Sequence, residues 1–405
     1  MKLAYYSPMP PSRSGVADYS ALLLPELGER IDVTVVKSGR FRLMPKADVS
    51  LYHIGNDPEA HGWIAQALAA RPGVVVLHEF VLHHLVAGLT LARGDARGYL
   101  DAMERGHGLA GRLLAYGVID NRIPPLWETR PESFPLTGDV LTHATGLIVH
   151  SAFVEERARA AGYEGPVWRI PHPAWPTELV RAAEVEGSPL FGCFGHLNES
   201  KRIPQLLAAF ERVRADHPEA RLLLVGGLAP RLAGLEVPDG VIREDYVDEG
   251  RLWSLMAACD AIVSLRSPTM GETSGSAIRA LSLGKPLVVS DVGWFSELPA
   301  EVAVRVPVGE HETGTLAAAL DALATDVEAR EALGRAARDL VEREHGLERV
   351  ADRYAAAVEE AAGGPAVDES VLRDVAEAAA DVGIGADDPV ASELAVRLDE
   401  VGLGG

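Results

Sequence analysis

The sequence has few cysteines and no long apolar run. Its only cysteines, Cys193 and Cys259, lie in apolar segments. They are expected to be buried free thiols, so neither a disulfide framework nor a cysteine-based metal site is available. No run reaches the roughly 18 consecutive apolar residues of a membrane-spanning helix, and no signal-peptide pattern precedes the first strand-like segment. These absences predict a cytoplasmic protein without a transmembrane segment.

Positive charge is also scarce. The 405 residues include 38 Lys and Arg against 59 Asp and Glu, which gives a net charge of −21. Nucleic-acid binding and broad docking on anionic lipid both need a basic surface, so the charge argues against both. Most of the basic residues are arginines, and a lysine inside a motif therefore stands out. The only lysines are Lys2, Lys37, Lys46, Lys201 and Lys285.

Short apolar runs alternate with helical periods in two successive series. Such alternation predicts parallel sheets covered by helices on both faces. The predicted strands of the first series are 3–6, 33–36, 49–52, 74–77 and 147–149; those of the second are 190–194, 221–225, 261–265, 287–289 and 302–306. The predicted fold class is therefore α/β, with two Rossmann-like, doubly wound domains that face a central cleft. A cleft of this kind is the default ligand site.

Proline and glycine mark the predicted boundaries. A proline-rich segment at 170–176 ends the first series, so the predicted domains are 1–172 and 189–345, followed by a C-terminal helix at 346–363. Gly363, Gly364 and Pro365 then form a strong break. The acidic, Ala-rich segment 366–405 is predicted to be a helical or mobile tail.

A first chemical motif follows the strand at 190–194. Gly195 and His196 begin a loop that ends at Lys201 and Arg202, where a helix starts. A helix N-terminus already carries partial positive charge, so two cations there are unfavourable unless an anion shares the site. Backbone amides, Lys201 and Arg202 would then converge on a phosphate. The alternative is a solvated basic pair in a loop.

A second motif combines a carboxylate with a turn rich in hydrogen-bond donors. Glu272 precedes Thr273, Ser274, Gly275 and Ser276, which lead into a helix. The turn suits phosphate oxygens, and the carboxylate of Glu272 suits sugar hydroxyls. The alternative is an ordinary N-cap with an acidic first turn.

A third motif is His78, which directly follows the apolar strand at 74–77. It is either a ligand-facing histidine or an ordinary hydrogen-bonded loop residue. A zinc-protease motif starting at His78 would need a second histidine where Leu82 stands. No metal site is predicted.

Taken in order, these motifs resemble those of the large retaining glycosyltransferase family four, which has the GT-B fold. The segment from Gly195 to Lys201 resembles the family's phosphate loop, and the segment from Glu272 to Pro286 resembles its Glu-x7-Glu region. The loop at 10–19, the strand and glycine turn at 223–227, and the segments 149–151 and 170–173 also match. The resemblance covers about residues 1 to 360.

The resemblance implies a retaining, metal-independent hexosyltransferase-like enzyme that needs no cofactor. Its nucleotide-sugar donor would lie mainly on the second domain, and an unidentified small-molecule, glycan or lipid-linked acceptor on the first. Lys201 and Arg202, with amides near Gly15 and 274–276, would stabilise the leaving diphosphate. Glu272 would hold sugar hydroxyls, and His78 would orient the sugar or the acceptor. A homo-oligomer is compatible with the sequence.

The sequence departs from the family pattern at two places. His196 replaces the usual Arg of the phosphate loop. The second Glu, which the family places near the ribose, is replaced by Ala280, with Arg279 one position earlier. Glu297 is an alternative carboxylate for the ribose. These departures keep two other functions open: a GT-B nucleotide-sugar epimerase or hydrolase, and a non-catalytic protein that binds sugar nucleotides.

Overall fold

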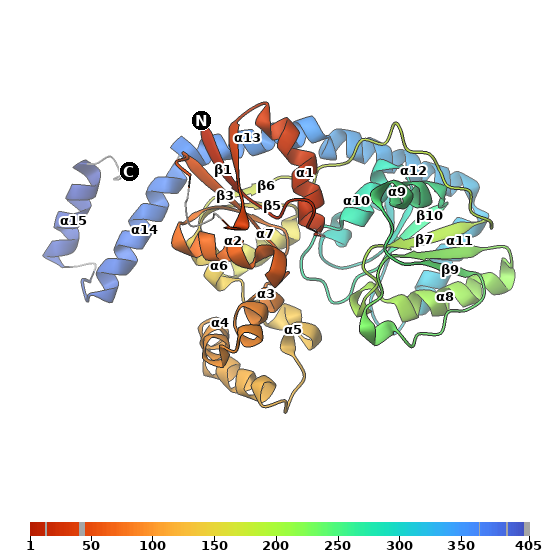
Figure 1. Cartoon of the computed structure of the whole chain (residues 1–405), viewed down its shortest axis with the longest axis horizontal. Coiled ribbons are helices and arrows are strands. Elements are labelled where there is room, and N and C mark those ends of the chain that lie inside the picture. The colour runs from red at the N-terminus through yellow and green to blue at the C-terminus, as the bar shows by residue number, and fades with distance from the viewer. Residues whose placement is uncertain (13, 40–44, 364, 386–387, 401–405) are drawn as a thin grey trace.

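The computed structural model describes residues 1–12, 14–39, 45–363, 365–385 and 388–400 (Figure 1). Arg13 of the predicted Gly15 loop lies outside the described residues. So do residues 386–387 and 401–405 of the predicted tail.

The first domain is built on a six-stranded parallel sheet with the order β2-β1-β3-β4-β5-β6. Its strands are β1 (Lys2–Tyr6), β2 (Asp32–Val36), β3 (Val49–Ile54), β4 (Gly73–Leu77), β5 (Ala144–Val149) and β6 (Val167–Arg169). The central strands β3 and β4 are buried along their whole length. Burial on both faces explains their near-continuous apolar sequence, because helices cover a parallel sheet on each side.

Helices connect these strands, and several of them begin at ordinary side-chain caps. Ser14, Asp57 and Ser151 each accept a backbone N–H from the first turn of the helix that follows. The helices are α1 (Gly15–Gly28), α2 (Pro58–Ala70), α3 (His83–Leu89), α4 (Ala96–Ile119), α5 (Leu126–Thr129), α6 (Gly138–His143) and α7 (Ala152–Ala160). Helix α4 is bent at His107 and Gly108, where φ of Gly108 is 62°. Helices α4 and α5 project below the sheet (Figure 1).

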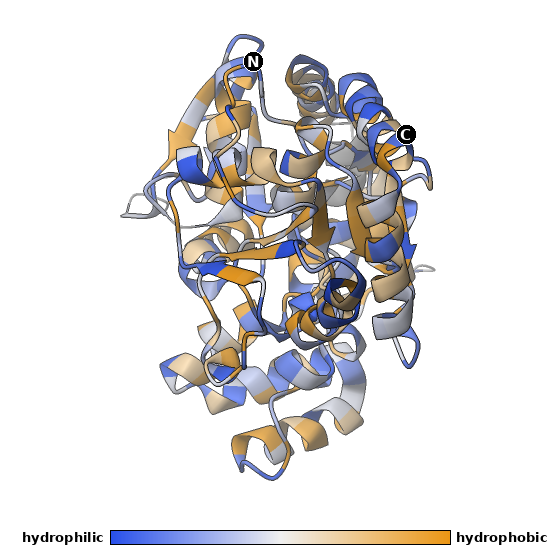
Figure 2. Cartoon of the chain, turned by 90° about the vertical axis from the view of Figure 1, so that its right-hand side faces the viewer, coloured by the Kyte–Doolittle hydropathy of each residue, from blue (hydrophilic) through white to orange (hydrophobic). Residues whose placement is uncertain are grey.

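The second domain repeats the design with the strand order β12-β11-β10-β7-β8-β9. Its strands are β7 (Leu190–Phe194), β8 (Arg221–Val225), β9 (Val241–Glu244), β10 (Ala261–Ser264), β11 (Leu287–Ser290) and β12 (Ala303–Val306). Its helices are α8 (Ile203–Asp216), α9 (Glu249–Ala258), α10 (Gly275–Ser282), α11 (Glu312–Thr325) and α12 (Val327–Leu340). Figure 2 shows apolar residues concentrated in strands, whereas many helices mix polar and apolar residues.

The chain returns to the first domain after α12. Helix α13 (Leu347–Gly363) runs from the second lobe along the first (Figure 1), and its buried face packs on α1 through Tyr354. The hydroxyl groups of Tyr354 and Tyr19 lie 2.6 Å apart. Helix α14 (Pro365–Asp381) contacts α13 and β5, and α15 (Pro389–Glu400) follows it. Both helices lie in the segment that the sequence predicts to be a helical or mobile tail.

The strand orders place two switch points at the edges where ligands bind in doubly wound sheets. In the first sheet, connections diverge between β1 and β3; in the second, they diverge between β7 and β10. The loops that leave the carboxyl ends of adjacent strands part at such a point and leave a crevice. The predicted α/β class is confirmed, and the two crevices are where functional side chains are expected.

Candidate functional site

The switch point of the second sheet begins with two closely packed glycines. Gly195 follows β7 with φ of +94°, and Gly226 follows β8 with φ of +135°. A side chain on Gly226 would clash with the carbonyl oxygen of Gly195. The loops after β7 and β8 therefore pack backbone against backbone, which only glycine permits at this place.

Lys201 lies directly beside this loop and is buried, with 6% of its surface exposed. Its Nζ donates to the carbonyl oxygen of Phe194 at 2.5 Å. Burial, with a smaller contribution from Arg266, lowers the pKa of Lys201 to about 8. An anion bound beside this amine would favour its charged form, and the predicted role of Lys201 as a phosphate ligand stays a prediction.

Arg266 is a second cation at the same switch point, and the sequence motifs did not identify it. It follows β10, and its guanidinium donates to the hydroxyl of Ser200 at 2.9 Å. Its Nε lies 2.7 Å from a carboxylate oxygen of Glu272. Only its position in the sequence could have indicated it. Arg266 comes directly after the predicted strand 261–265, and this strand lies beside the strand 190–194 that precedes Lys201. We call Lys201, Arg266 and Glu272 the strand-end charge cluster.

Glu272 is held in this cluster by its own loop as well as by Arg266. Its second carboxylate oxygen accepts from the backbone N–H of Met270 at 2.8 Å and from the hydroxyl of Thr269 at 3.2 Å. A carboxylate with several fixed donors keeps one orientation. The predicted contact of Glu272 with sugar hydroxyls stays a prediction.

The turn after Glu272 caps helix α10. The hydroxyl of Ser274 accepts from the N–H of Ala277 at 3.3 Å and lies 3.1 Å from the hydroxyl of Ser276. Ser274 is thus the N-cap of α10, although no acidic residue stands in the first turn of this helix. The hydroxyl of Thr273 is buried and has no hydrogen-bond partner among the described residues. Gly275 begins the helix, so the turn also presents the N–H groups that a phosphate would need.

Three residues that were predicted to contact the nucleotide-sugar donor have other neighbours in the structure or are exposed. Arg202, with φ of 56°, forms an ion pair with the buried carboxylate of Glu312. Glu297 accepts from the N–H groups of Ala152 and Phe153, at 3.0 and 2.7 Å, and so caps α7 across the domain boundary. His196 is exposed. Arg202 and Glu297 therefore make structural contacts, whereas His196 is exposed to solvent. The predicted contacts of all three with a donor stay predictions.

The corresponding edge of the first domain is lined by histidines. His53 is the last but one residue of β3, His78 follows β4, His150 follows β5 and His172 follows β6; all four are buried. The ring of Tyr19 from α1 lies 4.8 to 5.8 Å from the four imidazole rings, measured between ring centres. We call these four residues the histidine cluster. The sequence assigned a ligand role to His78 alone.

The histidine cluster is uncharged. Burial lowers the pKa of His53, His78 and His172 well below 6.5, and neighbouring imidazoles lower it further. Burial likewise lowers the pKa of His150 to about 4. The strand ends of the first domain thus carry neutral imidazole rings, whereas those of the second domain carry charged side chains.

Glu79 connects the two edges. It follows His78, and burial together with the negative charge of Glu272 raises its pKa to about 8. The next residues cross the boundary, because the N–H groups of Phe80 and Val81 both donate to the carbonyl oxygen of Met270, at 2.8 and 2.9 Å. Glu79 is a further candidate residue that the sequence motifs missed.

A second contact brings the Gly15 loop toward helix α10. Asp18, in the first turn of α1, lies 3.2 Å from the guanidinium of Arg279 in α10. That guanidinium stacks 3.9 Å above the ring of Trp175. Gly15 is exposed, and an added side chain would meet nothing within 4 Å. The Gly15 loop and the turn at 274–276 therefore begin two helices that are tied together one turn further on.

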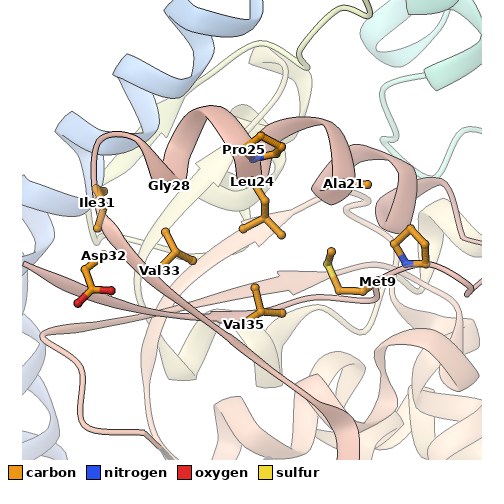
Figure 3. A pocket seen from close by; sticks show the side chains of 10 residues that line it. Met9, Ala21, Leu24, Pro25, Gly28, Ile31, Asp32, Val33 and Val35 are labelled. Carbon is orange, nitrogen blue, oxygen red and sulfur yellow. The ribbon is translucent and has the colours of Figure 1, made fainter.

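The site is distinct from a large surface hollow in the first domain. A cavity of about 700 Å³ lies between α1 and the edge strand β2, where its lining includes Leu24, Val33 and Val35 (Figure 3). None of the predicted site residues lines it. The strand-end geometry, rather than cavity size, defines the candidate site.

Part of the chain matches a known protein family. Residues 177–340 match the family model described as "Glycosyl transferases group 1". The match contains the strand-end charge cluster and most of the second domain, and over these residues the predicted resemblance to glycosyltransferases is confirmed. No curated protein matches the sequence.

Solved structures with the same fold extend over both domains. The chain is similar to sucrose-phosphate synthase from Thermosynechococcus elongatus, with 18% identity, a TM-score of 0.62, and coverage of 89% of this chain and 98% of the other. It is also similar to Anabaena Alr3699/HepE in complex with UDP-glucose, with 15% identity, a TM-score of 0.60, and coverage of 89% and 100%. AviGT4, a glycosyltransferase involved in avilamycin A biosynthesis, has 17% identity, a TM-score of 0.53, and coverage of 90% and 98%. The predicted GT-B fold is confirmed.

Within the described part of the chain, no helix is both long and apolar enough to span a membrane.

Proposed function

We propose that the protein is a retaining glycosyltransferase that moves a hexose from a nucleotide-sugar donor to an acceptor bound on the first domain. The observation that carries this proposal is the buried Lys201 beside Arg266 at the β7–β10 switch point. The family match over residues 177–340 supports it independently. Because a similar structure contains UDP-glucose, a UDP-hexose is the first donor to test.

The second domain supplies charge stabilisation in this proposal. Negative charge grows on the diphosphate as the bond to the sugar breaks, and preorganised donors at that place lower the barrier. Lys201 and Arg266 would face this charge, with the N-terminus of α10 contributing N–H groups. A divalent metal is then not required for leaving-group stabilisation. Whether Arg202 adds a further contact depends on release of its ion pair with Glu312.

The sugar and the acceptor would lie between the two strand-end edges. Glu272 would accept hydrogen bonds from sugar hydroxyls, and His78 would meet the sugar or acceptor from the opposite side. The backbone contacts of Phe80 and Val81 with Met270 hold the edges together and would limit access of water. If the acceptor hydroxyl attacks the anomeric carbon from the same face from which the diphosphate leaves, the anomeric configuration is retained.

The proposal is tested by binding and product analysis on the full chain. Titration calorimetry with UDP and with UDP-glucose, each with and without a chelator, measures the donor site directly. Release of UDP from UDP-glucose is then followed with and without candidate acceptors. Sugar transfer that survives chelation is expected. An epimerised nucleotide sugar, or hydrolysis that no acceptor diverts, would assign the site to a different reaction. Tight binding with no turnover on any acceptor would favour a binding protein.

A further inference from the structure

The shortest contact between imidazoles in the histidine cluster joins His53 to His78. Nδ1 of His53 lies 2.9 Å from Nε2 of His78, and the rings stack at 27°. Both residues are buried, at 0% and 8% exposure. At this distance one nitrogen donates and the other accepts, so the position of one proton decides which face of His78 is a donor.

The remaining nitrogen of His53 indicates the direction of this hydrogen bond. Nε2 of His53 is buried and has no partner among the described residues. If the proton were on Nε2, a buried N–H would be left without an acceptor, which is among the rarest and costliest arrangements in proteins. If the proton is on Nδ1, it is used in the bond to His78 and only a lone pair remains unpaired.

The surrounding histidines follow the same pattern. Nδ1 of His61, His150 and His172 lies 3.0, 2.8 and 2.8 Å, respectively, from a backbone carbonyl oxygen. A carbonyl oxygen only accepts, so each of these rings carries a proton on Nδ1. The carbonyl that His61 contacts is that of His53 itself, which helps to fix the backbone of His53.

We propose that His53 is a positioning residue for His78. It donates its Nδ1–H to Nε2 of His78, and this fixes His78 as the neutral tautomer with its own proton on Nδ1. His78 then meets the substrate through Nδ1–H, as a hydrogen-bond donor, and its basic lone pair is already occupied. This inference rests on the proposed function, since it specifies how His78 would hold a sugar or acceptor oxygen rather than remove a proton from it.

Two nearly isosteric variants test the role of the hydrogen bond. In His53→Asn the amide nitrogen can replace Nδ1 as donor, whereas His53→Leu keeps a similar volume without a donor. UDP release from UDP-glucose should fall roughly 10- to 100-fold in kcat for His53→Leu, with little change in KM, and should stay close to wild type for His53→Asn. His345→Asn, a change at a buried histidine whose Nδ1 contacts the carbonyl of His172, is the control for loss of a structural imidazole. Equal losses in the Asn and Leu variants of His53 would overturn the proposal.

Nitrogen NMR on the full chain labelled at histidine provides a measurement that does not depend on turnover. At pH 7.5 the resonances of His78, assigned with His78→Gln, should be those of a neutral ring protonated on Nδ1. In His53→Leu this tautomer should no longer be fixed. An Nε2–H tautomer of His78 in the wild type would overturn the inference. Failure of the wild type to bind UDP or UDP-glucose would instead contradict the proposed donor, while the NMR result would still decide the tautomer.

Discussion

The two domains share one architecture but present opposite chemistry at their facing edges. The strand ends of the first sheet carry the histidine cluster, whose members are neutral and pack around Tyr19. Those of the second sheet carry Lys201, Arg266 and Glu272. Strand ends are interchangeable positions as far as the fold is concerned, so the proposed function would account for this difference. Charges suit a diphosphate, and neutral rings suit hydroxyl groups.

The largest expected effect separates the domains by pH. The histidine cluster is neutral in the fold, whereas unfolded histidines have a pKa of about 6.5, so unfolding takes up protons below that pH. Each ring should therefore remove up to about 1.4 kcal/mol of stability per pH unit below 6.5, until the pH reaches its folded pKa. The stability is fully present above pH 6.5 and is lost as the pH falls.

Hydrogen exchange at pH 7.5 and 5.5, corrected for intrinsic rates, measures this domain by domain. Peptides from β3, β4 and β5 should lose protection by several kcal/mol, and peptides from β7, β8 and β10 by much less. The second domain is the internal control. An equal loss in both domains would show that general acid destabilisation, rather than the histidine cluster, controls stability.

Removing the central charge of the second domain should have the next largest effect. Lys201→Ala deletes a buried cation that would face the leaving diphosphate, and loss of one such contact costs about 3 kcal/mol, or roughly 100-fold in rate. Lys285→Ala is the matched control, because Lys285 is also partly buried in this domain but near Cys259 and Asp260. UDP release from UDP-glucose should fall only for Lys201→Ala. A folded Lys201→Ala protein with unchanged kinetics would contradict the phosphate site.

The functional side chains at the strand ends were easier to predict from the sequence in the second domain than in the first, for a physical reason. Lys201 follows a strand within a spaced local motif, so its position was predictable. Arg266 belongs to no motif, and the members of the histidine cluster lie at the ends of four separate strands that only the parallel sheet brings together. The central strands of both sheets were predicted from apolar runs. The edge strands β6 and β9 were missed because they are short and only partly buried, and therefore lack such runs.

A smaller effect should distinguish sugar from nucleotide within the second domain. Glu272→Ala should weaken binding of UDP-glucose by roughly 1–3 kcal/mol, the cost of leaving buried hydroxyls without a partner. Binding of UDP should change less, because Lys201 and the turn at 274–276 remain. Titration calorimetry with both ligands, on wild type and variant, gives the difference directly. An equal loss of affinity for both ligands would show that Glu272 contacts the nucleotide, or that it acts indirectly by holding Arg266 in place.

The smallest effect at neutral pH is expected at Glu79, where the two edges meet. The pKa of Glu79 is raised to about 8, so its carboxyl is protonated at pH 7, and Glu79→Gln should change UDP-glucose binding less than about twofold. Above pH 8 the wild type gains a negative charge at Glu79 while Lys201, whose pKa is also about 8, loses its positive charge. Both changes oppose a diphosphate. Across pH 7 to 9.5, a plot of log Kd against pH should therefore rise toward a slope of two in the wild type. In Glu79→Gln, where only Lys201 titrates, the slope should approach one. Identical slopes would show that Glu79 does not face the donor, and the neutral and charged edges would then act separately.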